Sequence, residues 1–312
     1  FLPHFDNPIL AELGDGAVLG DGPRSTVVTT DSFVVSPLEF PGGNIGSLAV
    51  HGTLNDLAMM GAAPVCLTAA FILEEGLSFE LLDRVAAAMG LAARDAGVPI
   101  VTGDTKVVER GKADGMYINT TGIGQRLERV RPGPERAVPG DRILVSGPVG
   151  RHGMAIMAVR ESLGFDSAIE SDSATLWPLV RQLLECLGAD VHVLRDPTRG
   201  GVASALNEIA AASKVGIVLD EAAIPVPGPV AAACEILGLD PLYVANEGVF
   251  LAVVPPSAVE PALAVLSSHP LGTGARLIGR VEAAHPGFVV METGLGGTRV
   301  VDMLPGDQLP RI

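Results

Sequence analysis

Four aspartates stand where apolar or β-branched runs meet polar turns: Asp31 in TTDS, Asp56 in LND, Asp104 in GDT and Asp196 in RDPT. Mg²⁺ in proteins is held by carboxylate oxygens together with phosphate oxygens. We expect the four residues at strand ends or in loops, where the strand ends of an α/β layer converge on a ligand. The pattern indicates a nucleotide–metal site, although each aspartate alone is also an ordinary turn or capping residue.

Three further side chains could act on a phosphate or move a proton. Lys106 follows Asp104 by two residues and could neutralise charge on a transferred phosphoryl group, unless it is an ordinary surface lysine. Glu247 in ANEG lies between apolar runs, where a carboxylate is costly unless it is paired or used. Arg199 in PTRGG could clamp an anion, beside two glycines that permit close approach of the main chain.

A helix predicted over 45–60 carries a polar stripe. Asn44, Ser47, His51 and Asn55 recur at helical spacing, with Asp56 at the edge of the stripe. The stripe lacks the Lys and Glu that usually coat an exposed helix. We therefore expect it to face a cleft, the alternative being a solvated helix face.

Composition excludes several classes of function. The 312 residues have a net charge of −15 and 4% aromatics, which argues against nucleic-acid binding. No Walker A motif occurs, SGPVGRHG is not a dinucleotide fingerprint, and no apolar run is long enough for a membrane span. The three cysteines are isolated from one another, which is typical of a reducing cytoplasm and provides neither a zinc site nor a disulfide framework.

Strands and helices alternate in both halves of the chain, which predicts an α/β (α+β) fold with two domains. We expect domains over 1–138 and 139–303 and a flexible tail over 304–312, because RPGPERAVPGD (Arg131–Asp141) has the composition of a linker, with the boundary near Pro139. PIVTG is predicted to be a short buried strand followed by the loop DTK, and LYVANEGVFLAVV a strand, a polar interruption and a second strand.

Longer motifs add a resemblance. They are TTDSFVVSPLEFPGGNIGSLAVHGTLNDLAMMGA, FILEEGL, VTGDTKVVERG, INTTGIG, RDPTRGGV, LYVANEG, SHPLG and LPRI, in this order over nearly the whole chain. In these segments the chain resembles the HypE family of hydrogenase maturation factors. That family belongs with aminoimidazole ribonucleotide synthetase, selenophosphate synthetase and thiamine monophosphate kinase. The resemblance implies a homodimer whose N-terminal domains share a β-barrel.

The resemblance also implies an activity. HypE proteins receive a carbamoyl group from HypF on a C-terminal cysteine, dehydrate it with ATP and Mg²⁺ to a thiocyanate, and pass cyanide to the HypC–HypD complex. By resemblance, Asp31, Asp56, Asp104 and Asp196 hold Mg²⁺-ATP. We expect nucleotide contacts from Asn44, Thr105 and Arg199 as well.

Roles in the dehydration step follow from the same resemblance. Glu247 is assigned to proton removal and Lys106 to phosphate stabilisation. His51 is a second candidate base, because an imidazole with a pKa near neutrality suits proton transfer.

Two departures from the family pattern concern the ends. A Gly-rich segment is expected before Phe1 and a cysteine after Ile312, so we expect this polypeptide to fold and dimerise without carrying a carbamoyl group. Two other functions stay open. One is another ATP-dependent member of the superfamily, such as selenophosphate synthetase or a small-molecule kinase, against which the ending LPRI argues. The other is a non-catalytic maturation scaffold, which ATP dependence would exclude.

Overall fold

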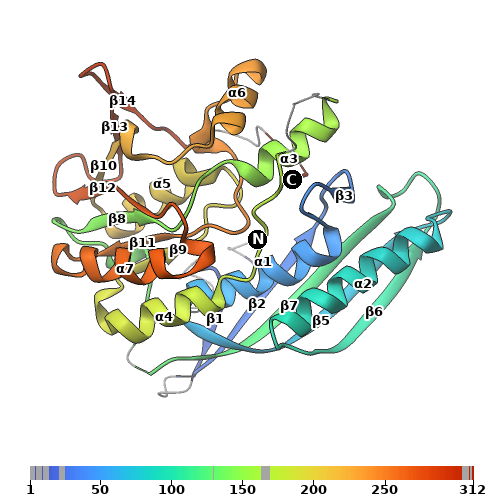
Figure 1. Cartoon of the computed structure of the whole chain (residues 1–312). Coiled ribbons are helices and arrows are strands. Elements are labelled where there is room, and N and C mark those ends of the chain that lie inside the picture. The colour runs from blue at the N-terminus through green and yellow to red at the C-terminus, as the bar shows by residue number, and fades with distance from the viewer. Residues whose placement is uncertain are drawn as a thin grey trace.

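The computed structural model describes residues 4, 9, 14–20, 25–128, 130–162, 169–303, 309, 311 and 312. It contains two main sheets, which lie in different halves of the chain and are each covered by helices (Figure 1). The mixed α/β architecture expected from the sequence is confirmed. No helix among these described residues is long and apolar enough to cross a membrane.

The first sheet has the strand order β1-β2-β7-β5-β6. Its strands are β1 (Ala17–Leu19), β2 (Thr26–Phe33), β5 (Ala62–Glu74), β6 (Ile100–Val108) and β7 (Met116–Arg126). Neighbours are antiparallel except for β5 and β6, which are parallel. A separate two-stranded ribbon pairs β3 (Glu39–Phe40) with β4 (Gly43–Asn44).

Two helices cover one face of this sheet: α1 (Ile45–Met59) and α2 (Phe79–Asp95). α1 begins at Asn44, whose side chain accepts hydrogen bonds from the N–H groups of Gly46 and Ser47. α2 is amphipathic and buries Val85 and Met89 against the sheet side. α1 is instead buried around most of its circumference, because the second domain covers its remaining face.

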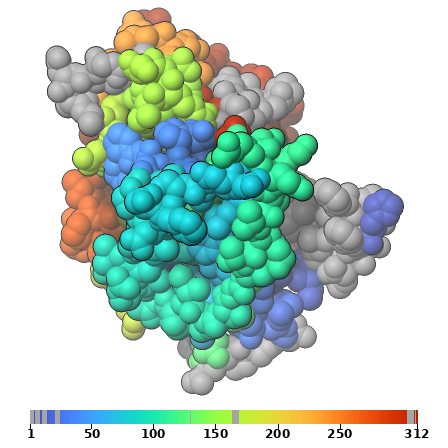
Figure 2. Space-filling view, turned by 90° about the vertical axis from the view of Figure 1, so that its right-hand side faces the viewer, coloured from blue at the N-terminus to red at the C-terminus, as the bar shows by residue number. Residues whose placement is uncertain are grey.

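The prediction of a short buried strand over 99–103 is wrong in both the length and the burial of the strand. β6 continues to Val108, so Asp104 and Lys106 lie within the strand, and nearly every residue of it is exposed. The sequence pattern shows a strand but not its place at the edge of a sheet. Figure 2 faces this side of the molecule, where the teal atoms of α2 and β6 form the surface. Among the described strands the sheet is open, with edges at β1 and β6, so one chain forms no closed barrel.

The second sheet has the order β14-β13-β10-β12-β8-β11-β9. Its strands are β8 (Arg142–Val145), β9 (Val193–Arg195), β10 (Gly216–Asp220), β11 (Leu251–Val254), β12 (Arg276–Glu282), β13 (Val289–Glu292) and β14 (Thr298–Val300). Its helices are α3 (Arg151–Arg160), α4 (Trp177–Leu187), α5 (Gly201–Ser213), α6 (Gly228–Leu237) and α7 (Val259–Ser268). Single 3₁₀ turns span Pro134–Arg136, Gly188–Asp190, Glu221–Ala223, Pro241–Tyr243, Pro256–Ala258 and Pro270–Gly272.

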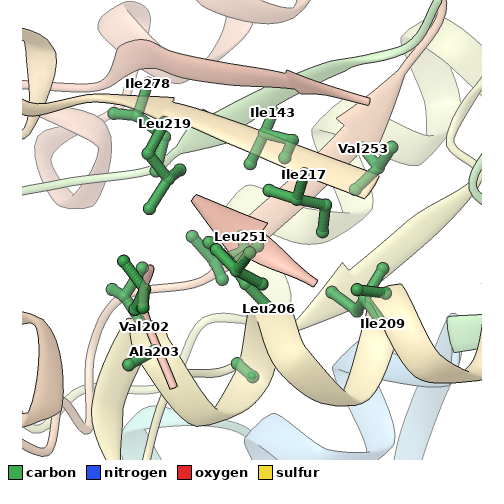
Figure 3. Close-up of a cluster of buried hydrophobic side chains, with 14 of the residues drawn as sticks. Ile143, Val202, Ala203, Leu206, Ile209, Ile217, Leu219, Leu251, Val253 and Ile278 are labelled. Atoms are coloured by element: carbon green, nitrogen blue, oxygen red, sulfur yellow. The ribbon is translucent and has the colours of Figure 1, made fainter. Parts of the chain in front are cut away.

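Both faces of the second sheet are packed. Alternate residues point to opposite sides: Ile143 and Val145 meet α5, whereas Leu144 meets α4 and α7. Figure 3 shows the first of these cores, with Leu206 of α5 near Ile217 and Leu251 of the sheet. This two-sided burial explains why strands such as LAVV carry no polar residue.

One further expectation differs from the structure, and another falls mostly outside the described residues. Leu242–Val254 contains only one strand, β11, because residues 241–243 form a 3₁₀ turn before the ANEG loop. Most of the expected flexible tail, residues 304–308 and 310, lies outside the described residues. Leu309 is buried beside α3 and α6, and the carbonyl oxygen of Arg311 accepts a hydrogen bond of 3.1 Å from Ser36 N–H.

Candidate active site

Three aspartates meet between the two domains. Asp15 precedes β1, Asp56 lies in α1, and Asp196 directly follows β9. Each can offer one carboxylate oxygen, and these oxygens all lie within 4.8 Å of one another. Three carboxylates at this separation repel each other unless a cation is present, and oxygen ligands are those that Mg²⁺ prefers. The chemistry of this donor set therefore fits a divalent cation.

Burial and the close approach of these carboxyl groups shift their pKa values. Burial, followed by the charge of Asp196, raises the pKa of Asp56 well above its ordinary value, and a hydrogen bond of 2.8 Å from the Thr29 hydroxyl opposes this effect. Burial also raises the pKa of Asp196, which the neighbouring Arg195 partly offsets. Arg195 forms an ion pair with Asp15 as well. The group as described carries more negative charge than its single close cation balances.

Asp31 belongs to the same neighbourhood. It lies inside β2 rather than in a loop, and its charge raises the pKa values of Asp56, Asp196 and Glu247. The expectation that the aspartates occupy strand ends or loops is correct for Asp196 only. Asp56 is helical because α1 continues to Met59, three residues beyond it.

Glu247 faces this acidic group from the loop before β11. Its Oε2 atom lies 3.7 Å from the place that a Cβ atom at Gly52 of α1 would occupy. Burial is the main cause that raises the pKa of Glu247 well above its ordinary value, and the charge of Asp196 is the next. A carboxyl group whose pKa is raised by burial and by neighbouring charges is a candidate for proton transfer.

The Glu247 loop is held by buried amides. Asn246 donates from Nδ2 to the carbonyl oxygens of Pro197 and Val244, at 3.0 Å each, and so ties this loop to the one that carries Asp196. Asn55 donates from Nδ2 to the carbonyl oxygens of Ala174 (3.0 Å) and Glu247 (3.1 Å). Side-chain amides from both domains thus fix the main chain of Glu247.

The polar stripe of α1 therefore faces the second domain. Asn55 accepts a hydrogen bond of 2.8 Å from Leu176 N–H, and His51 Nδ1 lies 3.0 Å from Ser173 Oγ. Asn44 caps the helix, which occupies its side-chain oxygen. The stripe was expected to face a cleft. His51 and Asn55 instead contact the segment that joins α3 to α4, and Asn44 and Ser47 form the helix cap.

His51 lies apart from the acidic group. It lines a separate cavity of about 290 Å³, together with Asp95, Ser173 and Trp177. Burial lowers the pKa of His51 to about 4, and the nearest charge that acts on it is that of Asp95.

The acidic group is also distant from three other predicted site residues of the same chain, Asp104, Thr105 and Lys106. Lys106 forms an exposed ion pair of 2.8 Å with Asp104, and this contact lowers the pKa of the Asp104 carboxyl. β2 and β6 are three strand spacings apart, or about 14 Å. Thr105 and Asp104 also line a cavity of about 660 Å³ between β6 and α2.

Asp104 and Lys106 also point to the opposite face of the sheet from Asp31. Thr120 of β7 pairs with Asp31 and donates a hydrogen bond to the carbonyl oxygen of Ala49, so its row faces α1. Following the pairing through Ala69, that row reaches Gly103 on β6. The next residue, Asp104, therefore points to the opposite face, as does Lys106.

Arg199 lies exposed in the turn before α5, three residues after Asp196. The following Gly201 has φ +60°, and a Cβ atom there would lie 2.5 Å from the carbonyl oxygen of Leu242. Gly201 thus permits close approach to the Leu242–Val244 main chain, and Gly200 lies against Ser204.

Comparison with known proteins identifies the family. Residues 13–125 match AIR synthase related protein, N-terminal domain, and residues 138–292 match the C-terminal domain of the same family. The carbamoyl dehydratase HypE of Cupriavidus necator is 56% identical over 314 residues, which cover 100% of this chain and 89% of that protein. The chain belongs to the HypE family.

Solved structures of HypE proteins agree with this assignment. The HypE chain of a HypE–HypF complex superposes with a TM-score of 0.93 at 47% identity, over 97% of this chain and 98% of that one. A HypE structure in complex with ATP gives a TM-score of 0.89 at 53% identity, over 100% and 93% of the two chains.

Sequence reasoning missed two acidic residues of the candidate site. Asp15 in GDG and Asp172 in SDS stand in segments that read as ordinary turns. The repeated pattern of an aspartate beside glycine, as in GDT, is the signal that could have included Asp15. Nothing in the sequence marks Asp172, because its importance depends on which loop of the second domain packs against it.

Proposed function

We propose that this chain is an ATP-dependent carbamoyl dehydratase of [NiFe] hydrogenase maturation, and that Glu247 with the acidic group is its active site. The observation that carries the proposal is a carboxyl group with a raised pKa facing carboxylates placed to hold a divalent cation. Membership of the HypE family and the ATP complex of a relative support it.

The reaction converts an S-bound carboxamide into a thiocyanate. The carboxamide oxygen attacks the γ-phosphorus of ATP, ADP leaves, and one N–H proton is lost. The resulting O-phosphorylated intermediate then loses phosphate and the second N–H proton, which leaves the C≡N bond. Phosphorylation is needed because the amide oxygen is otherwise a poor leaving group.

The chain's own groups supply proton transfer. Glu247 accepts an N–H proton, and its partly buried position keeps competing water away. Asp15, Asp56 and Asp196 are the residues that would hold Mg²⁺. Bound there, the ion would neutralise their charge, favour the ionised form of Glu247 and hold phosphate oxygens.

A second copy of the chain supplies Lys106. The strand β6 presents an exposed edge, with Val101 59% and Val107 68% exposed, which is a ready surface for pairing. We place the homodimer contact here, with Asp104, Thr105 and Lys106 of one copy completing the nucleotide site of the other. This arrangement accounts for the position of Asp104 and Lys106 on the far face of the sheet within one chain.

The remaining partners follow from the family. A relative has been solved as a HypE–HypF complex, and we propose HypF as the carbamoyl donor for this chain. We further propose the HypC–HypD complex as the cyanide acceptor and the cytoplasm as the compartment, which three free cysteines suit.

The proposed activity can be tested by measuring the mass of the chain during the reaction. A chain carrying a cysteine after Ile312 is incubated with HypF, carbamoyl phosphate and ATP. Intact-mass spectrometry should show a carbamoyl adduct and then its loss of one water, only with ATP and Mg²⁺. Glu247→Gln should retain the adduct without losing water. Dehydration that proceeds without ATP would exclude the proposal, and an inert protein that still binds HypF would favour the scaffold.

A further inference from the structure

A fourth carboxylate outside the metal-ligand set touches the main chain of Glu247. Asp172 lies in the segment between α3 and α4, where it packs against the Glu247 loop. Its Oδ1 atom accepts a hydrogen bond of 3.3 Å from Glu247 N–H, and Gly248 N–H also bonds to this side chain. Its Oδ2 atom is shielded from solvent and has no partner among the described residues.

The contact is tight on the side of Gly248. A Cβ atom at Gly248 would lie only 1.7 Å from the carbonyl oxygen of Asp172. The Glu247–Gly248 main chain therefore lies directly against that of Asp172, and only glycine fits there. This close packing fixes the position of the Glu247 main chain, and therefore the point from which the Glu247 side chain extends.

Asp172 is itself anchored from both neighbours. Ser171 Oγ lies 2.8 Å from His152 Nδ1 of α3, and Ser173 Oγ lies 3.0 Å from His51 Nδ1 of α1. Ser173 N–H also donates to Ser171 Oγ at 3.0 Å, which closes the turn. Residues 171–173 thus form a short bridge between the domains, with Asp172 directed at the Glu247 loop.

We propose that Asp172 is a positioning residue, which holds the Glu247–Gly248 main chain so that the Glu247 carboxyl group stays over Gly52 and towards the acidic group. This inference rests on the proposed function for its catalytic consequence. The main-chain contacts exist independently of that function. Asp172 acts through Oδ1, an atom that asparagine reproduces and alanine removes.

The central comparison is Asp172→Ala against Asp172→Asn. The alanine variant should lower kcat of ATP-dependent dehydration about tenfold to hundredfold, the range for a reacting group displaced by about 1 Å. Its KM for ATP should stay near that of the wild type, because Asp172 is not among the nucleotide groups. Asp172→Asn should recover most of the lost rate.

Hydrogen exchange gives a readout that does not depend on catalysis. In Asp172→Ala the amides of Glu247 and Gly248 should exchange faster, and in Asp172→Asn they should remain protected. Asp220→Ala is the matched control, because Asp220 makes the same kind of bond, 3.0 Å to Ala222 N–H, at an exposed turn. It should change neither kcat nor the exchange at residues 247 and 248.

Asp172→Ser is the second variant if alanine fails to fold, because its hydroxyl is too short to replace Oδ1. Unchanged exchange at residues 247 and 248 in a folded Ala or Ser variant would overturn the inference. So would an Asn variant as impaired as Ala. A wild type without ATP-dependent dehydration would instead remove the proposed function and leave the exchange result standing.

Discussion

The carboxyl group of Glu247 lies against Gly52 of α1, which has no side chain to displace it. A Cβ atom at residue 52 would lie 3.7 Å from Glu247 Oε2 and 2.9 Å from Cζ of Phe33. The first of these is an ordinary contact and the second is a clash. The glycine therefore makes room for the Phe33 ring, whereas the Glu247 carboxyl group lies at ordinary contact distance from this position.

Gly52→Ala should lower the free energy of unfolding in spite of improving helix propensity. Alanine gains about 1 kcal/mol in a helix interior, but overpacking a core costs about 1–3 kcal/mol. Gly90→Ala in α2 is the control, since its nearest neighbour is the flexible end of Arg94 at 3.3 Å. Denaturant unfolding should show opposite signs, and equal stabilisation of both variants would contradict the packing argument.

Asn55→Ala should destabilise the protein by about 1–3 kcal/mol, because it removes the buried hydrogen bond to Leu176 N–H and the part-buried ones to the carbonyl oxygens of Ala174 and Glu247. It should also lower kcat. Asn207→Ala provides the contrast, since Asn207 donates to Ala203 and Val301 within the second domain. That variant should lose stability in urea titrations and keep the catalytic rate of the folded protein.

Mixing two inactive variants should restore activity if Lys106 acts on the site of the other copy. In a heterodimer of Lys106→Ala and Glu247→Gln, one site has both native residues and the other has neither. Dehydration by the mixture should therefore rise well above that of either variant alone. Size-exclusion chromatography with light scattering checks that dimers form. No recovery in a mixture shown to contain heterodimers would place Lys106 and Glu247 on the same chain.

Adding Mg²⁺ should raise the melting temperature through Asp15, Asp56 and Asp196. Binding at one hundred times the dissociation constant stabilises a native protein by about 2.7 kcal/mol. Asp196→Asn should remove most of the Mg²⁺-dependent shift measured in thermal scans at constant ionic strength. Asp220→Asn, at the exposed turn, should leave it intact. An equal shift in both variants would indicate a general salt effect.

The neutral His51 should make stability fall in mild acid. Its pKa is lowered to about 4 in the native state, whereas an unfolded histidine titrates near 6.5. The unfolded chain therefore binds the extra proton as the pH falls, so native stability is complete above pH ~6.5 and is lost towards pH ~4. Carboxyl groups with raised pKa values, such as Asp56, act in the opposite direction, so a difference between variants is needed.

The free-energy difference between wild type and His51→Gln isolates this contribution. It should shift by about 2 kcal/mol between pH 7 and pH 5, against the wild type at the lower pH. His285→Asn is the control, at an exposed turn with φ +53° that asparagine tolerates. A His51→Gln difference that is constant over this range would mean that the imidazole is not buried in the neutral form.

Local patterns in the sequence were sufficient for part of the fold. The helix predicted over 45–60, which the structure places over 45–59, and the alternation of strands and helices followed from residue spacing and turn chemistry. The sequence could not tell that β6 lies at a sheet edge, because an apolar run such as PIV looks the same in a buried strand. Edge position depends on the strand order of the whole domain.

The site was predictable in its types of residue and less so in its geometry. Asp56, Asp196 and Glu247 were identified, and the structure brings them together with Asp31. Lys106 and His51 were identified too, but the sequence could not show in which direction their side chains point. That direction depends on which parts of the fold pack against the strand and the helix that carry them. Asp172 carried no signal, because a hydrogen bond to a distant main chain leaves no pattern in the local sequence.

Trp177 is the sole tryptophan of the 312 residues, and it stands where α4 begins, on the wall of the cavity that contains His51. Its intrinsic fluorescence therefore arises from a single place, the seam between the two halves. A change in emission wavelength or lifetime would report loosening of that seam without any attached dye. The fluorescence of Trp177 can therefore report whether the two domains keep their relative position during turnover.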